Sequence, residues 1–200
     1  MVSMTGGQAL IRSLYREGVR VIFGLPGVQL YHALDAIHGE PAIRFISTRH
    51  EQAAAYMADG FARASGIVGT ALVVPGPGLL NASAGVGTAY SASSPILVVS
   101  GQIRSDRLGL NYGELHEVDD QIDFIRPLTK WSKRVVKTAE IPTVVHEAFV
   151  QLYTGRPRPV EIEVPEDMLE EIADVELLDP ERPQHPPANS EVIREAAGIL

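Results

Sequence analysis

The residue of this sequence best placed to do chemistry is Glu51. It stands in "RFISTRHEQAAAYMADGFARASG", residues 44–66, where a strand-like apolar segment runs directly into an alanine-rich segment typical of a helix. One explanation for Glu51 is a helix N-terminal carboxylate, which the macrodipole stabilises by ~0.3–1 kcal/mol. The other is a buried carboxyl group at the carboxyl end of a parallel strand, where open α/β sheets bind ligands. Burial there would favour the protonated group, which can donate a hydrogen bond.

A second signal is the glycine turn "VVPGPGLLN", which contains Gly76 and Gly78. A strand, a glycine turn and a helix start together present backbone N–H groups to an anion. The turn does not match the dinucleotide fingerprint, because Asn81 stands where a third glycine is needed, and no Gly-Lys-Ser/Thr follows it. A plain structural turn and a turn that lines a ligand site both remain open.

The sequence argues against a metal site built from its histidines. "HEQAA" resembles the start of a zinc-protease motif, but Ala54 stands where the second histidine is required. The six histidines show no ligand spacing, and the absence of cysteine excludes disulfides, thiolate catalysis and Cys-ligated metals. We therefore expect no metal ligands in this chain.

Composition narrows the class of protein further. The net charge is −8 with only 17 Lys and Arg and no basic run, so we expect no nucleic-acid partner. No apolar run approaches the ~18 residues of a membrane span. The first residues lack the basic and apolar regions of a signal peptide. A cytoplasmic location fits these features.

Strand-like and helix-like segments alternate along most of the chain. Apolar strands are expected at 19–24, 42–47, 95–101 and 158–167, and at 68–78, where the strand ends in a glycine-rich turn. Helices are expected at 5–18, 51–66, 79–93 and 141–155, and through Leu30, Leu34 and Ile37. Strands that are apolar on both faces and separated by helices indicate a parallel sheet covered on both sides. We expect a three-layer α/β/α fold with a central parallel sheet of about six strands.

The end of the chain has a different composition. We expect a domain at 1–172, an acidic proline-rich linker at 173–189, and the start of a truncated central domain at 190–200. The last segment begins a new amphipathic helix at a serine cap and then stops. This predicts that the chain is the front part of a longer protein.

Three ordered blocks carry a family resemblance: "GVRVIFGLPGVQLYHALD", "RHEQAAAYMADGFARASG" and "VVPGPGLLNASAGVGTAYSASSPILVVSGQ". Together they resemble the pyrimidine-binding domain of thiamine diphosphate enzymes, most closely the acetolactate synthase group, from Thr5 to about Met168. The resemblance implies that the Glu51 carboxyl group hydrogen-bonds N1′ of the cofactor's aminopyrimidine. That contact drives the 4′-amino group to its imino form, which removes the thiazolium C2 proton and gives the ylid.

The resemblance also implies roles for other residues. Those expected against the pyrimidine ring are Pro26, Gly27, Gly76, Gly78 and Asn81. Gln102 and His116 are expected on the substrate side. The acetolactate synthase pattern is broken where Leu115 and His116 replace a Phe-Gln pair and where Glu166 replaces a lysine. These departures argue against pyruvate condensation specifically, but not against the cofactor.

In such enzymes each site lies between the pyrimidine domain of one subunit and the pyrophosphate domain of another. The resemblance thus implies a homodimer or homotetramer, Mg²⁺ held by a domain outside this chain, and half a site here. The alanines after Glu51 would give a partner subunit room to close over the site. Binding of FAD is left open, because its site would lie in the central domain.

The resulting prediction is the N-terminal domain of a carboligase or decarboxylase acting on a 2-oxo acid. Two alternatives remain. One is a naturally short subunit of a split thiamine diphosphate decarboxylase. The other is a non-catalytic nucleotide-binding module that uses "PGPG", in which Glu51 would have no evident purpose.

Overall fold

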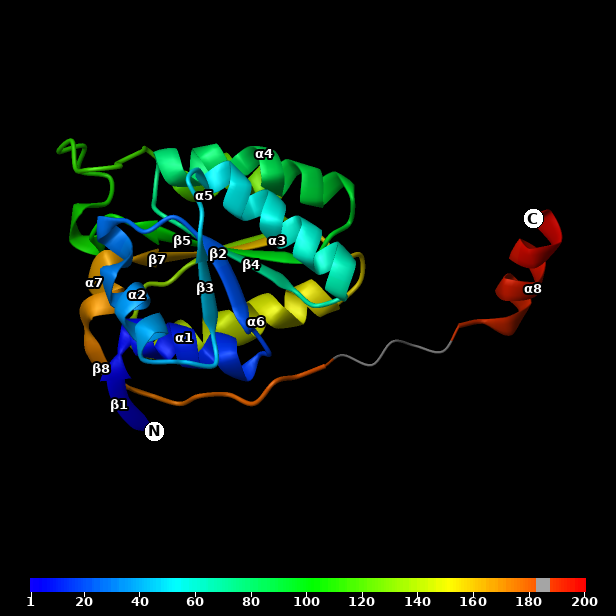
Figure 1. The fold of residues 1–200 in the computed structure, drawn as a ribbon, viewed down its shortest axis with the longest axis horizontal. Helices are drawn as coiled ribbons and strands as arrows, with labels where there is room; N and C mark the ends of the chain where they lie inside the picture. The colour runs from blue at the N-terminus through cyan, green and yellow to red at the C-terminus, as the bar shows by residue number, and fades with distance from the viewer. Residues whose placement is uncertain (183–187) are drawn as a thin grey trace.

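The computed structural model describes residues 1–182 and 188–200, and its centre is a six-stranded parallel sheet (Figure 1). The strand order is β3-β2-β4-β5-β7-β6. The strands are β2 (Val21–Gly24), β3 (Arg44–Ser47), β4 (Gly69–Val73), β5 (Ile96–Gln102), β6 (Trp131–Arg134) and β7 (Val160–Pro165). The prediction of a three-layer α/β/α fold with a parallel sheet is confirmed, although β6 lies in a segment that the alternation did not name.

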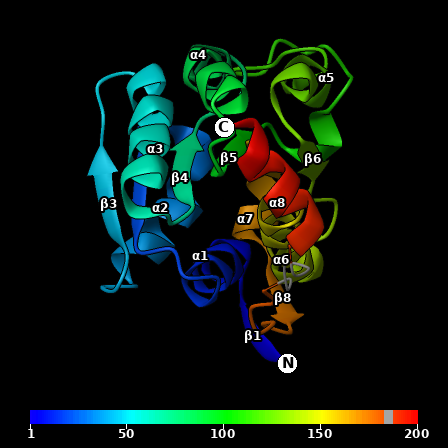
Figure 2. The same cartoon turned by 90° about the vertical axis from the view of Figure 1, so that its right-hand side faces the viewer.

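Helices cover both faces of the sheet, as the end-on view shows (Figure 2). One layer contains α1 (Gly6–Arg16), α2 (Tyr31–His38) and α6 (Ile141–Tyr153), and the other contains α3 (Glu51–Ser65), α4 (Pro77–Ser91) and α5 (Gln121–Ile125). Each layer forms its own apolar core with the sheet. The first core includes Leu14 and Phe149, and the second includes Ala58 and Val86.

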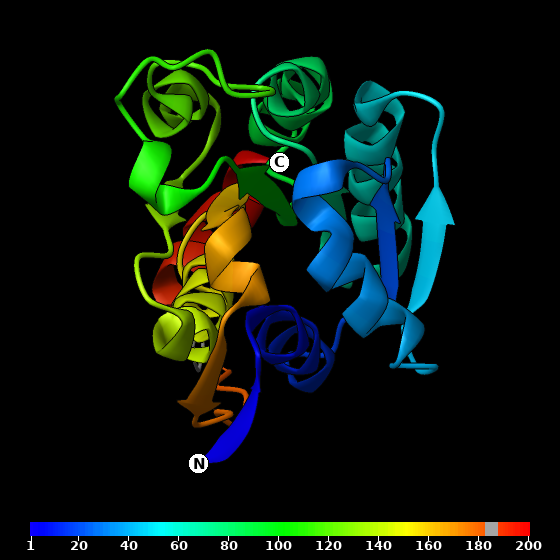
Figure 3. The same ribbon diagram turned by 90° about the vertical axis from the view of Figure 1, so that its left-hand side faces the viewer.

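The elements outside the main sheet extend the folded region past the expected boundary at residue 172. β1 (Val2–Thr5) pairs antiparallel with β8 (Ile172–Val175), and the two lie side by side (Figure 3). The short α7 (Glu166–Glu170) precedes β8, and α8 (Ser190–Ile199) forms in the segment predicted as a helix. Its cap is Asn189, whose Oδ1 accepts the Glu191 N–H at 2.9 Å, and the predicted serine cap, Ser190, is the first helical residue. Part of the predicted linker, 183–187, lies outside the described residues. Within the described ranges, no helix combines the length and apolarity needed to cross a membrane.

Local sequence signals explain where the helices begin. The predicted capping box holds α1: the Gln8 N–H donates to Thr5 Oγ1 at 3.2 Å, and the Thr5 N–H donates to Gln8 Oε1 at 3.1 Å. His50 caps α3, because its Nδ1 accepts the Gln52 N–H at 3.2 Å. Glu51 is therefore not the cap of α3 but its first helical residue.

The alanines of α3 have a role inside this chain. Ala54, Ala55 and Ala58 are fully buried. A Cβ added at Gly85 of α4 would lie only 2.6 Å from the Ala55 Cβ and 2.9 Å from the Tyr56 nitrogen. The surface that approaches these small residues is therefore α4 of the same chain, and the buried alanines are not room for a partner subunit.

This close packing makes Gly85→Ala a sensitive test of the α3–α4 contact. We expect a loss of about 1–3 kcal/mol from overpacking, against at most ~1 kcal/mol gained from helix propensity. Gly60→Ala in α3 is the matched control, since beyond its own helix backbone no atom of the described residues lies within 4 Å of its added Cβ. Urea unfolding of the chain measures both variants. Equal stability of the two would contradict the tight packing at Gly85.

Candidate active site

The predicted site residues follow strands whose carboxyl ends share one edge of the sheet. From β2 the chain moves outward to β3 and then returns to β4 on the other side of β2. The helices that follow β2 and β4, α2 and α4, lie on opposite faces of the sheet. This reversal makes the place between β2 and β4 a topological switch point, which is where open α/β sheets bind ligands.

Glu51 is held at this edge with its carboxyl group in a defined orientation. The residue is only 5% exposed. Asn81 Nδ2, from the first turns of α4, donates to Glu51 Oε2 at 2.9 Å. Among the described residues, no side chain donates to Oε1. The structure thus brings two of the predicted residues together and leaves one carboxyl oxygen available.

Two predicted glycine turns meet next to Glu51 on the side chain of Val74. A Cβ at Gly27 would lie 2.2 Å from Val74 Cγ1, and one at Gly78 would lie 2.5 Å from Val74 Cγ2. The Gly78 Cβ would also lie 3.5 Å from Glu51 Oε1. Pro26 is exposed beside Gly27. Val74 was not predicted as a site residue. Its position directly before the second glycine turn could have indicated that it packs against that turn.

Gly76 needs to be glycine for two reasons. Its φ is 53°, which side-chain-bearing residues rarely adopt, and an added Cβ would lie 2.2 Å from the carbonyl oxygen of His116. The Gly76 N–H donates to Gln121 Oε1 at 2.7 Å. This turn is therefore covered by the loop that follows β5.

The same contact brings His116 beside the second turn. Its Nδ1 lies 3.2 Å from Oε1 of Gln29, a residue only 4% exposed. Gln29 Nε2 also donates to the carbonyl oxygen of Leu115 at 3.0 Å. Gln29 was not predicted, because nothing in its position after the first turn distinguishes it from a helix-start residue.

Gln102 occupies a different environment from the other predicted residues. It is 1% exposed at the end of β5, and its Oε1 accepts the N–H of Ile103 at 2.7 Å. Its expected contact with substrate stays a prediction.

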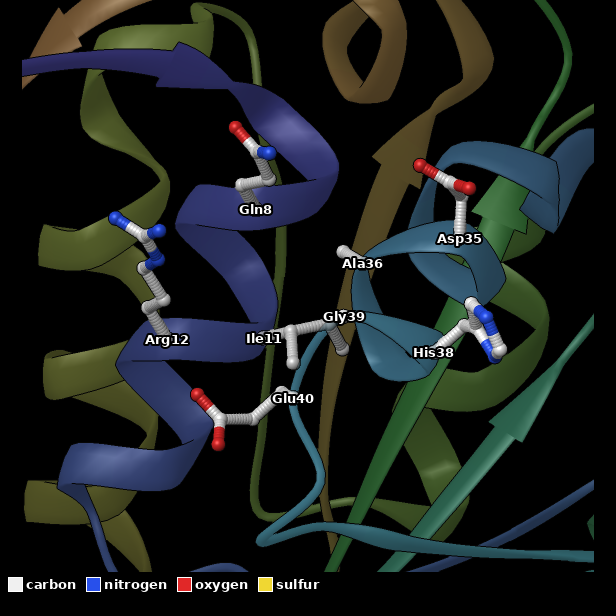
Figure 4. Close-up of a pocket in the computed structure, with 8 residues that line it drawn as sticks. All are labelled: Gln8, Ile11, Arg12, Asp35, Ala36, His38, Gly39 and Glu40. Atoms are coloured by element: carbon white, nitrogen blue, oxygen red, sulfur yellow. The ribbon is translucent and has the colours of Figure 1, made fainter.

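A polar hollow elsewhere on the molecule does not belong to this site. It lies between α1 and α2 and is lined by Gln8, Ile11, Arg12, Asp35, Ala36, His38, Gly39 and Glu40 (Figure 4). The side chains of Arg12, Asp35 and His38 are exposed, and the two helices lie on the face of the sheet opposite α3 and α4. Within the part of the chain that the structure describes, no cluster of three or more His, Cys, Asp or Glu residues could hold a metal ion.

A family model and the most similar curated proteins agree on one protein family for this chain. Residues 4–124 match the model of the thiamine pyrophosphate enzyme N-terminal TPP binding domain. A probable 2-ketoarginine decarboxylase of Pseudomonas aeruginosa is 42% identical over 84% of this chain. Acetolactate synthase isozyme 3 large subunit of Escherichia coli is also 42% identical over 84% of it, and the acetolactate synthase large subunit of Lactococcus lactis is 37% identical over 96%.

The chain spans only 30%, 29% and 33% of these three relatives, respectively. The family model covers more than half of the chain and includes Glu51, both glycine turns and the loop to His116. This chain belongs to the family of N-terminal thiamine pyrophosphate-binding domains of thiamine pyrophosphate enzymes.

Proposed function

We propose that this domain forms half the active site of a thiamine diphosphate-dependent carboligase or decarboxylase acting on a 2-oxo acid. Glu51 is the catalytic residue. The observation that carries the proposal is the buried Glu51 carboxyl group at the switch point, with one oxygen bound by Asn81 and the other free of side-chain donors among the described residues.

The residues around Glu51 fit an aminopyrimidine ring. Gly27 and Gly78 pack against the Val74 side chain beside the carboxyl group, and without Cβ atoms the backbone of both turns lies close to it. We propose that the flat ring binds against these two turns. Glu51 Oε1 would hold and release a proton at the ring nitrogen. Pro26, Gly76 and Asn81 would complete the cofactor contacts. The cofactor supplies the carbon nucleophile and the electron sink.

The names of the relatives support the substrate class. One is named for decarboxylation of 2-ketoarginine, a 2-oxo acid, and others for synthesis of acetolactate. We therefore propose a 2-oxo acid as substrate, with His116 and Gln102 on the substrate side. Leu115, His116 and Glu166 depart from the acetolactate synthase pattern, so pyruvate condensation is not the specific reaction proposed.

An uncovered apolar surface beside Glu51 supports the half-site arrangement. An open hollow on α3 is lined by His50, Gln52, Ala53, Tyr56 and Met57. Tyr56 and Met57 are 41% and 39% exposed. We propose that a second subunit covers this surface in a homodimer or homotetramer, and that its pyrophosphate domain holds Mg²⁺. If FAD binds, we propose that it binds in a central domain outside this chain. We also propose a cytoplasmic location, with which the cysteine-free sequence is consistent.

Calorimetric titration with magnesium and thiamine diphosphate tests this function. The complete protein encoded by the full reading frame is expected to bind, and the 200-residue chain alone is expected to give no measurable heat. Tight binding by the chain alone would refute the half-site. No binding by the complete protein would refute the function, and binding of ATP or NAD in its place would support the nucleotide-binding alternative.

A further inference from the structure

The sheet carries a polar cluster in its interior beneath α5. Glu161 and Glu163 of β7 and Ser100 of β5 are 0% exposed, and Gln121 of α5 is 1% exposed. Burying such groups is costly unless they are hydrogen-bonded, and for a carboxylate the cost is larger still. The usual apolar packing between helix and sheet is thus replaced here by a polar network, which requires an explanation.

The network gives the Gln121 side chain one orientation. Gln121 Nε2, which carries two hydrogens, lies within hydrogen-bonding distance of three acceptors: Ser100 Oγ at 2.9 Å, the Gly101 carbonyl oxygen at 3.0 Å and Glu163 Oε2 at 3.3 Å. Arg134 forms an ion pair with Glu163 from the neighbouring strand β6. The Gly101 carbonyl and the paired Glu163 carboxylate accept hydrogen bonds but do not donate them. The amide nitrogen of Gln121 must therefore face the sheet.

The opposite side of the amide reaches the candidate active site. Gln121 Oε1 accepts the buried N–H of Gly76 at 2.7 Å. Gly76 has φ 53° and ψ −112°, a backbone conformation that glycine adopts readily and that leaves its N–H pointing at α5. The hydrogen bond therefore ties this turn to a side chain that lies 45 residues away in the sequence. If the Gln121 amide turned over, two donors would face each other at Gly76.

Resting on the proposed function, we propose that Gln121 is a positioning residue for the cofactor turn at Gly76, held in one orientation by Glu163 and Arg134. Gln121 itself touches neither cofactor nor substrate in this assignment. It acts through the backbone of Gly76, which lies between Val74 and Gly78 of the same turn. Loss of the Gln121 oxygen would therefore let the turn shift and weaken both cofactor binding and turnover.

The first test is Gln121→Leu in the complete protein. We expect the Kd for thiamine diphosphate, with magnesium in excess, to rise about 10- to 100-fold, with a fall in kcat, as for other residues that orient a site from behind it. Ile162→Val is the matched control, because Ile162 lies buried on β7 between Glu161 and Glu163 but packs in the opposite core. Each variant is measured at the same interval below its own Tm, which removes the contribution of general destabilisation.

Gln121→Glu is a second test, which distinguishes a positioning role from a packing role because it keeps the shape of the side chain. It also tests the proposal if Gln121→Leu fails to fold. A protonated glutamic acid keeps an oxygen for Gly76 and an O–H for Glu163, whereas its carboxylate would face like charge. Titratable or charged groups around this position are Glu161, Glu163, Arg134, Asp119 and Asp120. Cofactor affinity of Gln121→Glu, relative to wild type, is expected to recover as the pH falls from about 8 to about 6.

The outcomes distinguish this assignment from the function on which it rests. If wild type binds thiamine diphosphate but Gln121→Leu binds it as Ile162→Val does, the positioning role is overturned. A Gln121→Glu affinity that follows wild type at every pH overturns it as well. Failure of wild type itself to bind refutes the proposed function instead.

Discussion

Glu51→Gln in the complete protein is expected to lower kcat by about 100- to 10,000-fold, the range for loss of a general acid–base group, while thiamine diphosphate still binds. The substitution keeps the volume of the side chain. Its amide oxygen can still accept from Asn81, and its amide nitrogen would then occupy the place of Oε1. Such an amide can donate permanently to a ring nitrogen but cannot take its proton back. Binding is therefore retained while proton transfer is lost.

Glu191→Gln provides the control for the simpler explanation of Glu51. Glu191 is an exposed carboxylate in the first turn of α8, so both substitutions remove a charge near a helix N-terminus. If the macrodipole were the reason for Glu51, each variant would lose only ~0.3–1 kcal/mol of stability and keep its activity. Turnover by Glu51→Gln close to that of Glu191→Gln would exclude the catalytic role.

Much of the fold around Glu51 could be read from local sequence signals. Thr5 and Gln8 specify the start of α1, and Gly66, with φ 72°, ends α3 where predicted. These features depend on residues within one helical turn, and so the sequence alone determines them. The strands β2 to β5 were equally clear, because apolar runs between helices indicate buried parallel strands.

The parts that could not be predicted depend on contacts between distant segments. The run Val-Glu-Ile-Glu-Val at 160–164 has the alternation of a half-exposed strand, yet every residue in it is buried. That burial is made tolerable by partners from other elements: Ser100 donates to Glu161, and Arg134 and Gln121 donate to Glu163. The pairing of β1 with β8 and the contact of Gln29 with His116 likewise join distant segments, so the local sequence pattern does not predict them.

The two buried glutamates predict an unusual dependence of stability on pH. Burial raises the pKa of Glu161 well above its ordinary value, and the nearby Glu163 charge raises it further. Burial also raises the pKa of Glu163, although its hydrogen bond and ion pair with Arg134 oppose the rise. A carboxyl group with a raised pKa in the folded state contributes stability below its unfolded pKa of ~4.3. That contribution is lost as the pH rises through the folded value.

Wild type is therefore expected to lose stability as the pH rises above the unfolded pKa of ~4.3, and Glu161→Gln, which cannot ionise, is expected to lose less. Thermal unfolding of the chain across this pH range measures both slopes. Because net charge becomes more negative with pH in either protein, the difference between the two slopes isolates Glu161. Parallel curves for wild type and Glu161→Gln would show that Glu161 does not titrate in the folded chain.

Arg134→Met should have the larger effect, because it leaves Glu163 buried without its counter-charge. Breaking a buried pair in this way costs about 3 kcal/mol or more, which is roughly 10 °C in Tm for a chain of this size. Measured at about pH 8 and about pH 5, the loss should be smaller at the lower pH, because the raised pKa of Glu163 favours a proton in place of the arginine as the pH falls.

Lys133→Met on the same strand is the control: its partner Glu147 lies at 2.7 Å, but both side chains are more than a third exposed. An exposed pair contributes at most ~1 kcal/mol and depends little on pH in this range. If Arg134→Met and Lys133→Met lost stability equally at both pH values, the Glu163 charge could not be what Arg134 stabilises.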